Sequence, residues 1–232
     1  MGLPTEEAVN INNFPYKIVF LTGVDGSGKT FLAKRLIEAL EAKGAPAIHV
    51  WSRFNNFLSK PLLAYTRLVG INYYEYENGV KVGYHDFENT TITSSLFVIL
   101  QLCDVWIASV FKFWIPVLRK KVIIVSDRGP HDTLIDVALD TGRKDLPKSF
   151  LGRLYLKAIP FRQARFFVFR ERSKIELARP DVTRDRKFQK RLELYLDNEK
   201  ELDFVRVDNN GTAEEVLSFI LNHLLYEEEK HP

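Results

Sequence analysis

The amino-acid sequence predicts one three-layer α/β domain, in which a five-stranded parallel sheet is flanked by helices. Short apolar runs of strand length alternate along the chain with segments of helical periodicity, and this alternation is typical of right-handed βαβ crossovers. The first run, Lys17–Thr22, is almost continuously apolar, as expected for a parallel strand that is buried on both faces. Because neither an internal repeat nor a linker divides the 232 residues, a single domain over residues 1–232 is expected.

The individual elements follow from spacing and end signals. A helix is expected at Lys29–Ala42, where apolar residues recur at helical spacing and Gly44 follows the last turn. Thr212 and Glu215 form a capping box that opens a final helix, expected to run to about Tyr226. Further helical segments are expected at Asn56–Val69, Ile92–Leu118 and Thr183–Leu202. The other four strands are expected at Ala47–Ser52, Lys121–Ser126, Ala164–Arg170 and Phe204–Val207.

A tyrosine-rich segment at about residues 70–90, Gly70–Asn89, fits neither periodicity, so a loop or a small irregular insertion is expected there. Two roles are open for its tyrosines. They pack locally within a long loop, or they stack on a ring of a bound acceptor. The tyrosines concerned are Tyr73, Tyr74, Tyr76 and Tyr84.

Composition narrows the classes of function. Hydrophobic residues make up 46% of the chain and charged residues 27%, which is enough apolar material for a real core and excludes a disordered chain. Cys103 is the one cysteine, expected to be a small core residue, so neither an intramolecular disulfide nor a cysteine-based zinc site is possible. This fits a reducing compartment, and a cytoplasmic location is expected. The balance of 33 basic against 30 acidic residues argues against general nucleic-acid binding.

One segment, Ile92–Leu118, is long and apolar enough to raise the question of a membrane span. Gln101, Asp104 and Lys112 interrupt it, and a charge at bilayer depth is costly, so no membrane association is expected. Its apolar residues lie on more than one face of the helix, which is hard to bury within one domain. We therefore expect the helix over residues 92–118 to pair with its copy in a homodimer.

The sharpest motif lies between the first strand and the first helix, where the sequence reads GVDGSGKT. It matches G-x-x-x-x-G-K-[ST] in the required strand–loop–helix context, which predicts a backbone nest for the phosphates of ATP. We expect Lys29 to reach the β- and γ-phosphates and the Thr30 hydroxyl to bind Mg²⁺. The expected phosphate-binding residues are Gly23, Gly26, Ser27, Gly28, Lys29 and Thr30.

Other residues discriminate among the proteins that share such a loop. The base-reading N-K-x-D or T-K-x-D element of a GTPase does not occur in the sequence. The strand at Lys121–Ser126 is followed by Asp127-Arg128-Gly129, which places an arginine beside the expected metal-side carboxylate. Such an arginine favours a site that holds a second phosphate over one that polarises water. The pattern therefore predicts transfer to a phosphorylated acceptor.

Taken in order along the chain, the GVDGSGKT loop, the DRG triplet and the later arginine-rich segment resemble thymidylate kinase and its close relatives, over roughly residues 16–226. The resemblance implies a P-loop kinase that uses ATP and Mg²⁺ to convert a nucleoside monophosphate, dTMP by default, to its diphosphate. It also implies that Asp25 faces the acceptor and the metal, and that Asp127 lies near the metal. By the same resemblance, Arg128 and Arg53 grip the acceptor phosphate.

Several positions depart from the family pattern. Gly129 stands where the family usually has an aromatic residue, and Asp132 aligns with the residue that reads the base. Cys103–Trp106 replaces an Ala-Asp-Arg sequence, and the segment at 70–90 has no close counterpart. Two alternatives therefore stay open: a same-fold kinase with another acceptor, or a regulator that binds ATP without turnover. An unphosphorylated acceptor would require a base, for which Asp25 or Asp132 would be the candidates.

An arginine- and lysine-rich segment, Arg165–Arg191, carries ten basic and four acidic residues. It is either a solvated helix face or a lid, at about residues 172–191, that closes over ATP and neutralises charge on the transferred group. Within it, Arg179, Arg184 and Arg186 are the expected lid arginines. Tyr84 and Asp132 complete the expected acceptor site. Three other acidic residues, Asp86, Glu88 and Asp136, are expected to be ordinary surface carboxylates.

Overall fold

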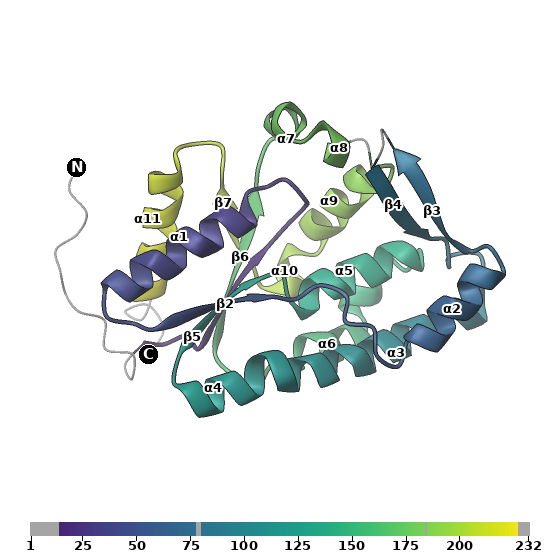
Figure 1. Cartoon of the computed structure of the whole chain (residues 1–232), viewed down its shortest axis with the longest axis horizontal. Coiled ribbons are helices and arrows are strands. Elements are labelled where there is room, and N and C mark those ends of the chain that lie inside the picture. The colour runs from purple at the N-terminus through teal and green to yellow at the C-terminus, as the bar shows by residue number, and fades with distance from the viewer. Residues whose placement is uncertain (1–13, 78–79, 184, 227–232) are drawn as a thin grey trace.

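Five strands form a parallel sheet in the order β2-β5-β1-β6-β7 in the computed structural model, which describes residues 14–77, 80–183 and 185–226 (Figure 1). The expected fold class, a three-layer α/β arrangement, is confirmed. Each strand begins and ends within two residues of its predicted bounds. The strands are β1 Ile18–Thr22, β2 Ala47–Trp51, β5 Ile123–Asp127, β6 Gln163–Phe169 and β7 Val205–Asp208.

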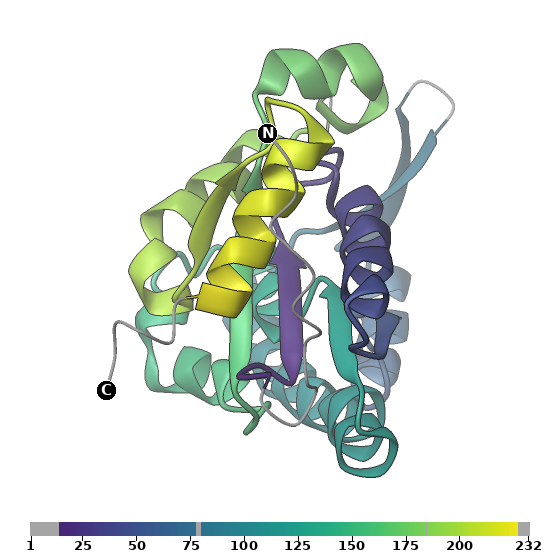
Figure 2. The ribbon, with the colours of Figure 1, turned by 90° about the vertical axis from the view of Figure 1, so that its left-hand side faces the viewer.

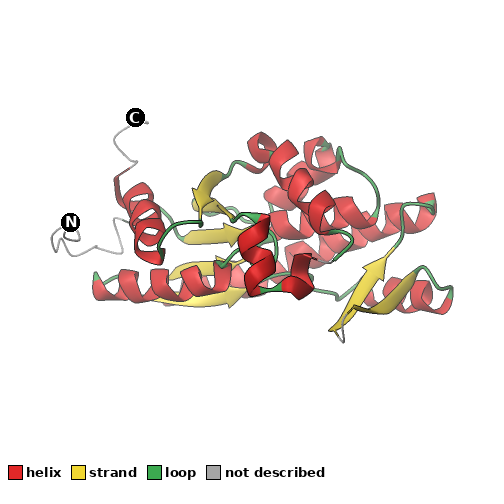
Figure 3. Ribbon diagram, turned by 90° about the horizontal axis from the view of Figure 1, so that it is seen from above, coloured by secondary structure: helices red, strands yellow, loops and turns green. Residues whose placement is uncertain are grey.

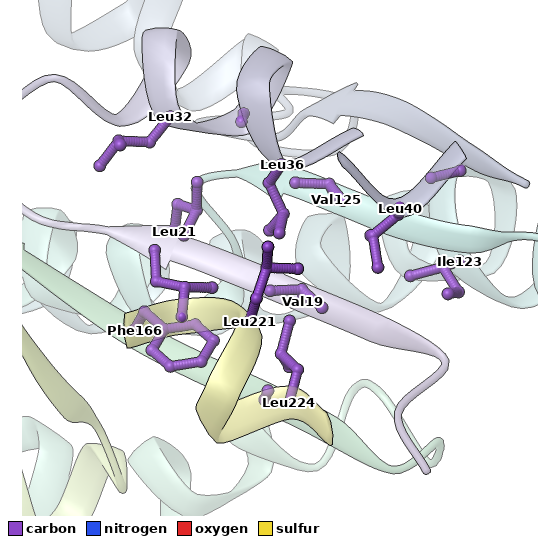
Figure 4. Packing of buried hydrophobic residues seen from close by; sticks show 14 of the residues in the cluster. Val19, Leu21, Leu32, Leu36, Leu40, Ile123, Val125, Phe166, Leu221 and Leu224 are labelled. Carbon is purple, nitrogen blue, oxygen red and sulfur yellow. The ribbon is translucent and has the colours of Figure 1, made fainter. Parts of the chain in front are cut away.

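Helices cover both faces of this sheet. The helices α1, Lys29–Ala42, and α11, Ala213–Tyr226, pack on one face, where leucines of α1 and α11 meet valines of β1 and β5 (Figures 2 and 4). Burial of these apolar side chains supplies the main stabilisation of the layers. The capping box of α11 is confirmed, because Thr212 N donates to Glu215 Oε2 at 3.0 Å and Glu215 N donates to Thr212 Oγ1 at 3.3 Å.

The remaining helices lie on the other face of the sheet or beyond its edges (Figure 1). They are α2 Lys60–Leu68, α3 Thr91–Ser109, α4 Ile115–Lys120, α5 Pro130–Asp140, α6 Phe150–Leu156, α7 Arg172–Ala178, α8 Pro180–Thr183, α9 Phe188–Asp197 and α10 Glu199–Leu202. A π-helical segment, Val110–Trp114, joins α3 to α4, and a short 3₁₀ turn, Leu146–Lys148, precedes α6.

The helix predictions were less accurate than the strand predictions. Neither α5 nor α6 was predicted; nearly every residue of α5 is buried, and its polar stripe of Asp132, Asp136 and Asp140 faces other parts of the protein instead of solvent. The single helix expected at Thr183–Leu202 is instead the end of α8 followed by α9 and α10. The long helix expected at Ile92–Leu118 is continuous in direction but widens into a π-turn just before Pro116.

The segment at residues 70–90 is not irregular, so that expectation was wrong. It contains an antiparallel hairpin of β3, Asn72–Glu77, and β4, Val80–His85, in which Tyr73 lies opposite Tyr84. Aromatic cross-strand pairs stabilise such two-stranded units. Figure 3 shows the hairpin set apart from the main sheet, beside the end of α2.

The α3–α4 region, Thr91–Lys120, is by length and composition the one helix in the described part of the chain that could cross a membrane. This is weak evidence, because the core helix of a soluble protein passes the same test and 44% of the apolar window is buried inside the protein. Phe97 and Val105 lie on its buried face, which packs against α5 and α6. Cys103 lies on the opposite face and is exposed, which corrects its expected place in the core.

The register of the sheet determines where functional side chains meet. Asp127 at the end of β5 lies beside Leu21 of β1 and beside Trp51 of β2. The loops that follow β1, β2 and β5 therefore leave the sheet at one edge. In a parallel sheet this carboxyl edge is where ligands bind.

Candidate functional site

The loop from Gly23 to Thr30 connects β1 to α1 at this edge. Its three glycines have positive φ angles, of 135° at Gly23, 79° at Gly26 and 97° at Gly28. A Cβ at Gly23 would lie 2.7 Å from the carbonyl oxygen of Val168, and one at Gly28 would lie 2.4 Å from the Asn209 amide nitrogen. Only glycine fits such positions, so the motif's glycines are required by backbone conformation and by close approach.

Lys29 is buried in the cradle that this loop forms. Its ammonium donates to the Val24 carbonyl oxygen at 2.6 Å and to Ser27 Oγ at 3.3 Å. Burial, with a smaller effect from Arg128, lowers the pKa of Lys29 to about 8. The cation is therefore held by loop oxygens, where it is available to an incoming phosphate.

A pair of oxygen ligands stands next to the loop. The Thr30 hydroxyl donates to Asp127 Oδ2, and Asp127 Oδ1 is buried with no hydrogen-bond partner in the part of the chain that the structure describes. Hydroxyl and carboxylate oxygens are ligands that Mg²⁺ prefers. Across residues 14–77, 80–183 and 185–226, no group of three histidine, cysteine or acidic side chains could hold a metal unaided. The donors therefore fit a Mg²⁺ ion that completes its shell with phosphate oxygens and water.

Arg128 lies beside this pair and is almost fully buried. Its backbone has a φ of 74°, rare for a residue other than glycine, and its guanidinium donates to Asp25 Oδ1. Arg53, from the loop after β2, donates to Asp25 Oδ2 at 3.3 Å. Burial alone would raise the pKa of Asp25, but Arg128, Arg53 and Lys29 outweigh it, so the pKa lies well below its ordinary value. Asp25 is therefore an anion between the two arginines.

Asp132, expected to read the acceptor, is fully buried beneath Arg128 instead. Its carboxylate accepts hydrogen bonds from Thr22 Oγ1 at 2.6 Å, from the Tyr195 hydroxyl at 2.8 Å and from the Gly129 backbone at 2.8 Å. It also lies 3.4 Å from Arg128 Nη1. The prediction that it contacts the acceptor is therefore wrong for this structure; Asp132 supports the arginine that would do so.

Two further expected residues, Tyr84 and Arg186, contact each other away from the P-loop. The Arg186 guanidinium lies 3.9 Å above the Tyr84 ring, and it also donates to the Tyr73 hydroxyl at 2.7 Å and to Asp86 at 3.1 Å. Tyr84 is buried by this contact, so its face is not open to an acceptor ring. Arg186 joins the hairpin to the segment before α9, and Asp86 is its partner rather than a free surface carboxylate.

Arg179, expected to be a lid arginine, lies close to the P-loop. It follows α7, donates to both carboxylate oxygens of Asp181 at 2.9 and 2.7 Å, and lies over the P-loop, where a Cβ at Gly26 would be 3.8 Å from its own Cβ. The helices α7 and α8 stand above the carboxyl edge of the sheet in Figure 1. Arg184 lies outside the described residues.

A cavity of about 490 Å³ opens between the P-loop and the α7–α8 segment. The loop, the Asp127 carboxylate and several arginines line this one space. Its lining residues are Asp25, Gly26, Gly28, Lys29, Thr30, Phe31, Asp127, Arg128, Arg179, Asp181, Val182, Asp185 and Arg191.

Four residues at this site were missed in the sequence. Asp136, expected on the surface, is buried between Arg53 and Arg191, and Asp185 pairs with Arg191 at 3.1 Å. Asn209, just after β7, donates to the Ser27 carbonyl oxygen at 2.7 Å. The sequence did contain a signal for the contact between Asp136 and Arg191. Acidic residues recur every four positions in α5, and Lys187 and Arg191 are also four positions apart.

No protein-family model and no curated protein sequence matches this chain. Among solved structures, it is similar to the thymidylate kinase from Ehrlichia chaffeensis, with a TM-score of 0.51 and 15% sequence identity. The match covers 89% of this chain and 97% of that chain. At this identity the likeness establishes a shared fold, and it extends over nearly the whole of both chains.

Proposed function

We propose that this protein is an ATP- and Mg²⁺-dependent kinase that transfers a phosphoryl group to a nucleoside monophosphate, with dTMP as the default acceptor. One observation carries the proposal: a single cavity is lined by the P-loop with Lys29, by Thr30 and Asp127, and by Arg128. These are the parts that hold a triphosphate, its metal ion and a second phosphate in line.

In this proposal, the P-loop backbone and Lys29 bind the β- and γ-phosphates of ATP, while Thr30 and Asp127 hold Mg²⁺. The bound ion would neutralise charge on the transferred group. Arg128 and Arg53 orient the acceptor phosphate. An acceptor oxygen forms the new bond to the γ-phosphorus as the bond to the bridging oxygen of ADP breaks. Catalysis is then positioning and electrostatic stabilisation.

A phosphorylated acceptor is favoured over a hydroxyl acceptor. A phosphate oxygen is already ionised, whereas a hydroxyl requires a general base. Asp132 is fully buried beneath Arg128, and the pKa of Asp25 is held well below its ordinary value by the arginines that outweigh its burial. Burial raises the pKa of Asp132, but this carboxylate does not line the cavity, so it is not placed to take a proton from an acceptor there. Asp25 lines the cavity, and its lowered pKa makes it a weak base.

The test is to incubate the protein with ATP, Mg²⁺ and each nucleoside monophosphate in turn, and to follow ADP. Release of ADP with dTMP alone supports the default acceptor, and release with another acceptor identifies that acceptor. Release without any acceptor would indicate an ATPase. Tight ATP binding with no ADP formed would indicate a regulator, and both outcomes would overturn the kinase proposal.

We also propose that the protein is a cytoplasmic homodimer paired through α3. Exposed apolar residues follow one another at spacings of three and four along this helix: Ile92 is 77% exposed, Leu96 45% and Ile99 49%. Such a stripe fits a partner helix. Sedimentation velocity at micromolar concentration should give the dimer mass, and Leu96→Glu should give the monomer; a monomeric wild type would contradict the proposal.

A further inference from the structure

Three side-chain contacts in antiparallel register join α5 to α9 and to Lys187, the residue just before α9; we call them the α5–α9 ladder. In each contact, or rung, an aspartate of α5 accepts a hydrogen bond of 2.8 Å. Successive aspartates are four positions apart in the sequence, and so are successive donor residues. The rungs pair Asp132 with Tyr195, Asp136 with Arg191, and Asp140 with Lys187. The ladder runs from beneath the P-loop cavity toward the hairpin.

The middle rung gathers two arginines from distant parts of the chain. Asp136 accepts from Arg191 Nε on Oδ1, at 2.8 Å, and from Arg53 Nε on Oδ2, at 3.0 Å. Its side chain is only 3% exposed, so both oxygens serve these two cations. Nη1 of Arg53 donates to Asp25 and Nη1 of Arg191 donates to Asp185. Among the described residues, neither Nη2 has a hydrogen-bond partner.

These two arginines border the cavity that contains the P-loop. Arg191 lines it, together with Arg128 and Lys29, and Arg53 reaches it through Asp25, which is also a lining residue. Planar guanidinium groups bind a phosphate dianion through paired hydrogen bonds. The orientation of both groups depends on one buried carboxylate.

The other two rungs do not meet this cavity. Asp132 is fully buried, and Asp140 lines a separate cavity of about 380 Å³, which His85 at the end of β4 also lines. Lys187, the partner of Asp140, lines that second cavity too. The ladder therefore contains an internal control. The outer rung, Asp140 with Lys187, also holds α5 to the start of α9, but it does not line the P-loop cavity.

We propose that Asp136 is a positioning residue that holds Arg53 and Arg191 as a clamp on the acceptor's phosphate group, and that docking of α9 along α5 assembles this clamp. The inference rests on the proposed function and extends it to two residues outside the family resemblance. A bound phosphate would take hydrogen bonds from the arginine nitrogens, while Asp136 keeps both guanidinium planes in place.

The test measures binding of inorganic phosphate to the full-length protein saturated with Mg²⁺ and a non-hydrolysable ATP analogue, which occupies the P-loop. Asp136→Asn preserves side-chain volume, but its NH₂ group cannot accept from an arginine. We expect phosphate affinity to fall by about tenfold or more, since misplaced charged donors lose much of their binding. Asp140→Asn, the matched control, should stay within about twofold. Thermal unfolding of both variants shows how much each substitution lowers the stability of the fold.

Arg191→Met provides a second route if Asp136→Asn folds poorly, because Asp136 then keeps Arg53 as its partner. It should also weaken phosphate binding, and by a larger factor than it weakens binding of the analogue, because in the proposed clamp Arg191 faces the acceptor's phosphate, whereas Lys29 faces the phosphates of ATP. Equal weakening by the variants at Asp136 and Asp140, or unchanged affinity in both Asp136→Asn and Arg191→Met, would overturn the clamp. Failure of the wild type to bind the analogue would instead refute the proposed kinase function, and the clamp would fall with it.

Discussion

The two ends of the P-loop cavity, which the proposed function assigns to ATP and to the acceptor, are built in different ways. At the ATP end, a contiguous loop from Gly23 to Thr30 presents backbone groups, and its shape depends on glycines with positive φ. At the acceptor end, side chains converge from the loops after β1, β2 and β5 and from α9. A site made of consecutive residues appears in the sequence as a motif, whereas a site assembled by tertiary contacts appears as scattered charges.

The two ends also differ in the chemistry of their cations. The ATP end relies on Lys29, and burial lowers its pKa to about 8. The acceptor end uses arginines, and Asp136 raises the pKa of Arg53 above its ordinary value. Arginine stays protonated at every pH a protein tolerates. Changes in pH should therefore affect the ATP end first.

The largest effect is expected from Lys29→Ala. Loss of the buried ammonium removes a phosphate clamp, and we expect turnover to fall at least about 100-fold. Lys34→Ala changes an exposed lysine of the same helix and should leave turnover within about twofold. Steady-state ADP release measures both. Turnover near the wild-type value in Lys29→Ala would contradict the proposed role of the P-loop.

Gly28→Ala tests the backbone part of the ATP end. The new Cβ would meet the Asn209 amide at 2.4 Å, and φ is 97°, so the loop must distort. We expect affinity for the ATP analogue to fall by about 10- to 100-fold, from strain of about 1–2 kcal/mol and the displaced neighbour. Gly44→Ala is the matched control, with a φ of 80° and no atom within 4 Å of the new Cβ. Calorimetric titration should show a loss at Gly28 only.

A pH titration should separate the two ends. In the proposed function ATP binds the charged form of Lys29, so affinity for the analogue should fall above pH 8, by up to about tenfold per pH unit. The stability of the free protein should change with pH in the opposite direction. Between pH 8 and 10.5 the Lys29 side chain binds more protons in the unfolded chain than in the folded one, so its contribution to the free energy of unfolding increases as the pH rises. Lys29→Arg should give an affinity that is flat over this range. Equal pH dependence in the arginine variant would show that Lys29 is not the titrating group.

The strands and the P-loop were predictable because their signals are local: apolar runs between turns, and a motif with a fixed spacing. The helix α5 was missed although its aspartates recur every four positions, and the burial of these aspartates against other elements depends on tertiary packing. Asp136 looked like a surface carboxylate and Asp132 like an acceptor contact, because their exposure depends on how α5 and α9 pack. The sequence showed the cluster of tyrosines in the hairpin. It did not show that Arg186 packs over the ring of Tyr84, because this contact joins residues that are far apart in the chain.

The smallest effect is expected from Tyr195→Phe, which removes one hydroxyl from the inner rung of the α5–α9 ladder. The hydroxyl donates to Asp132 at 2.8 Å, and Asp132 keeps three other donors, so we expect a loss of about 1 kcal/mol in the free energy of unfolding. Tyr155→Phe is a matched control, because its buried hydroxyl donates to the Val98 carbonyl oxygen at 2.7 Å, away from the cavity. Urea unfolding should show similar losses for both variants. Only Tyr195→Phe should also lower kcat/KM for the acceptor, by about two- to fivefold, since Asp132 orients Arg128. Equal kcat/KM values in the two variants would mean that the inner rung stabilises the fold without tuning the acceptor end.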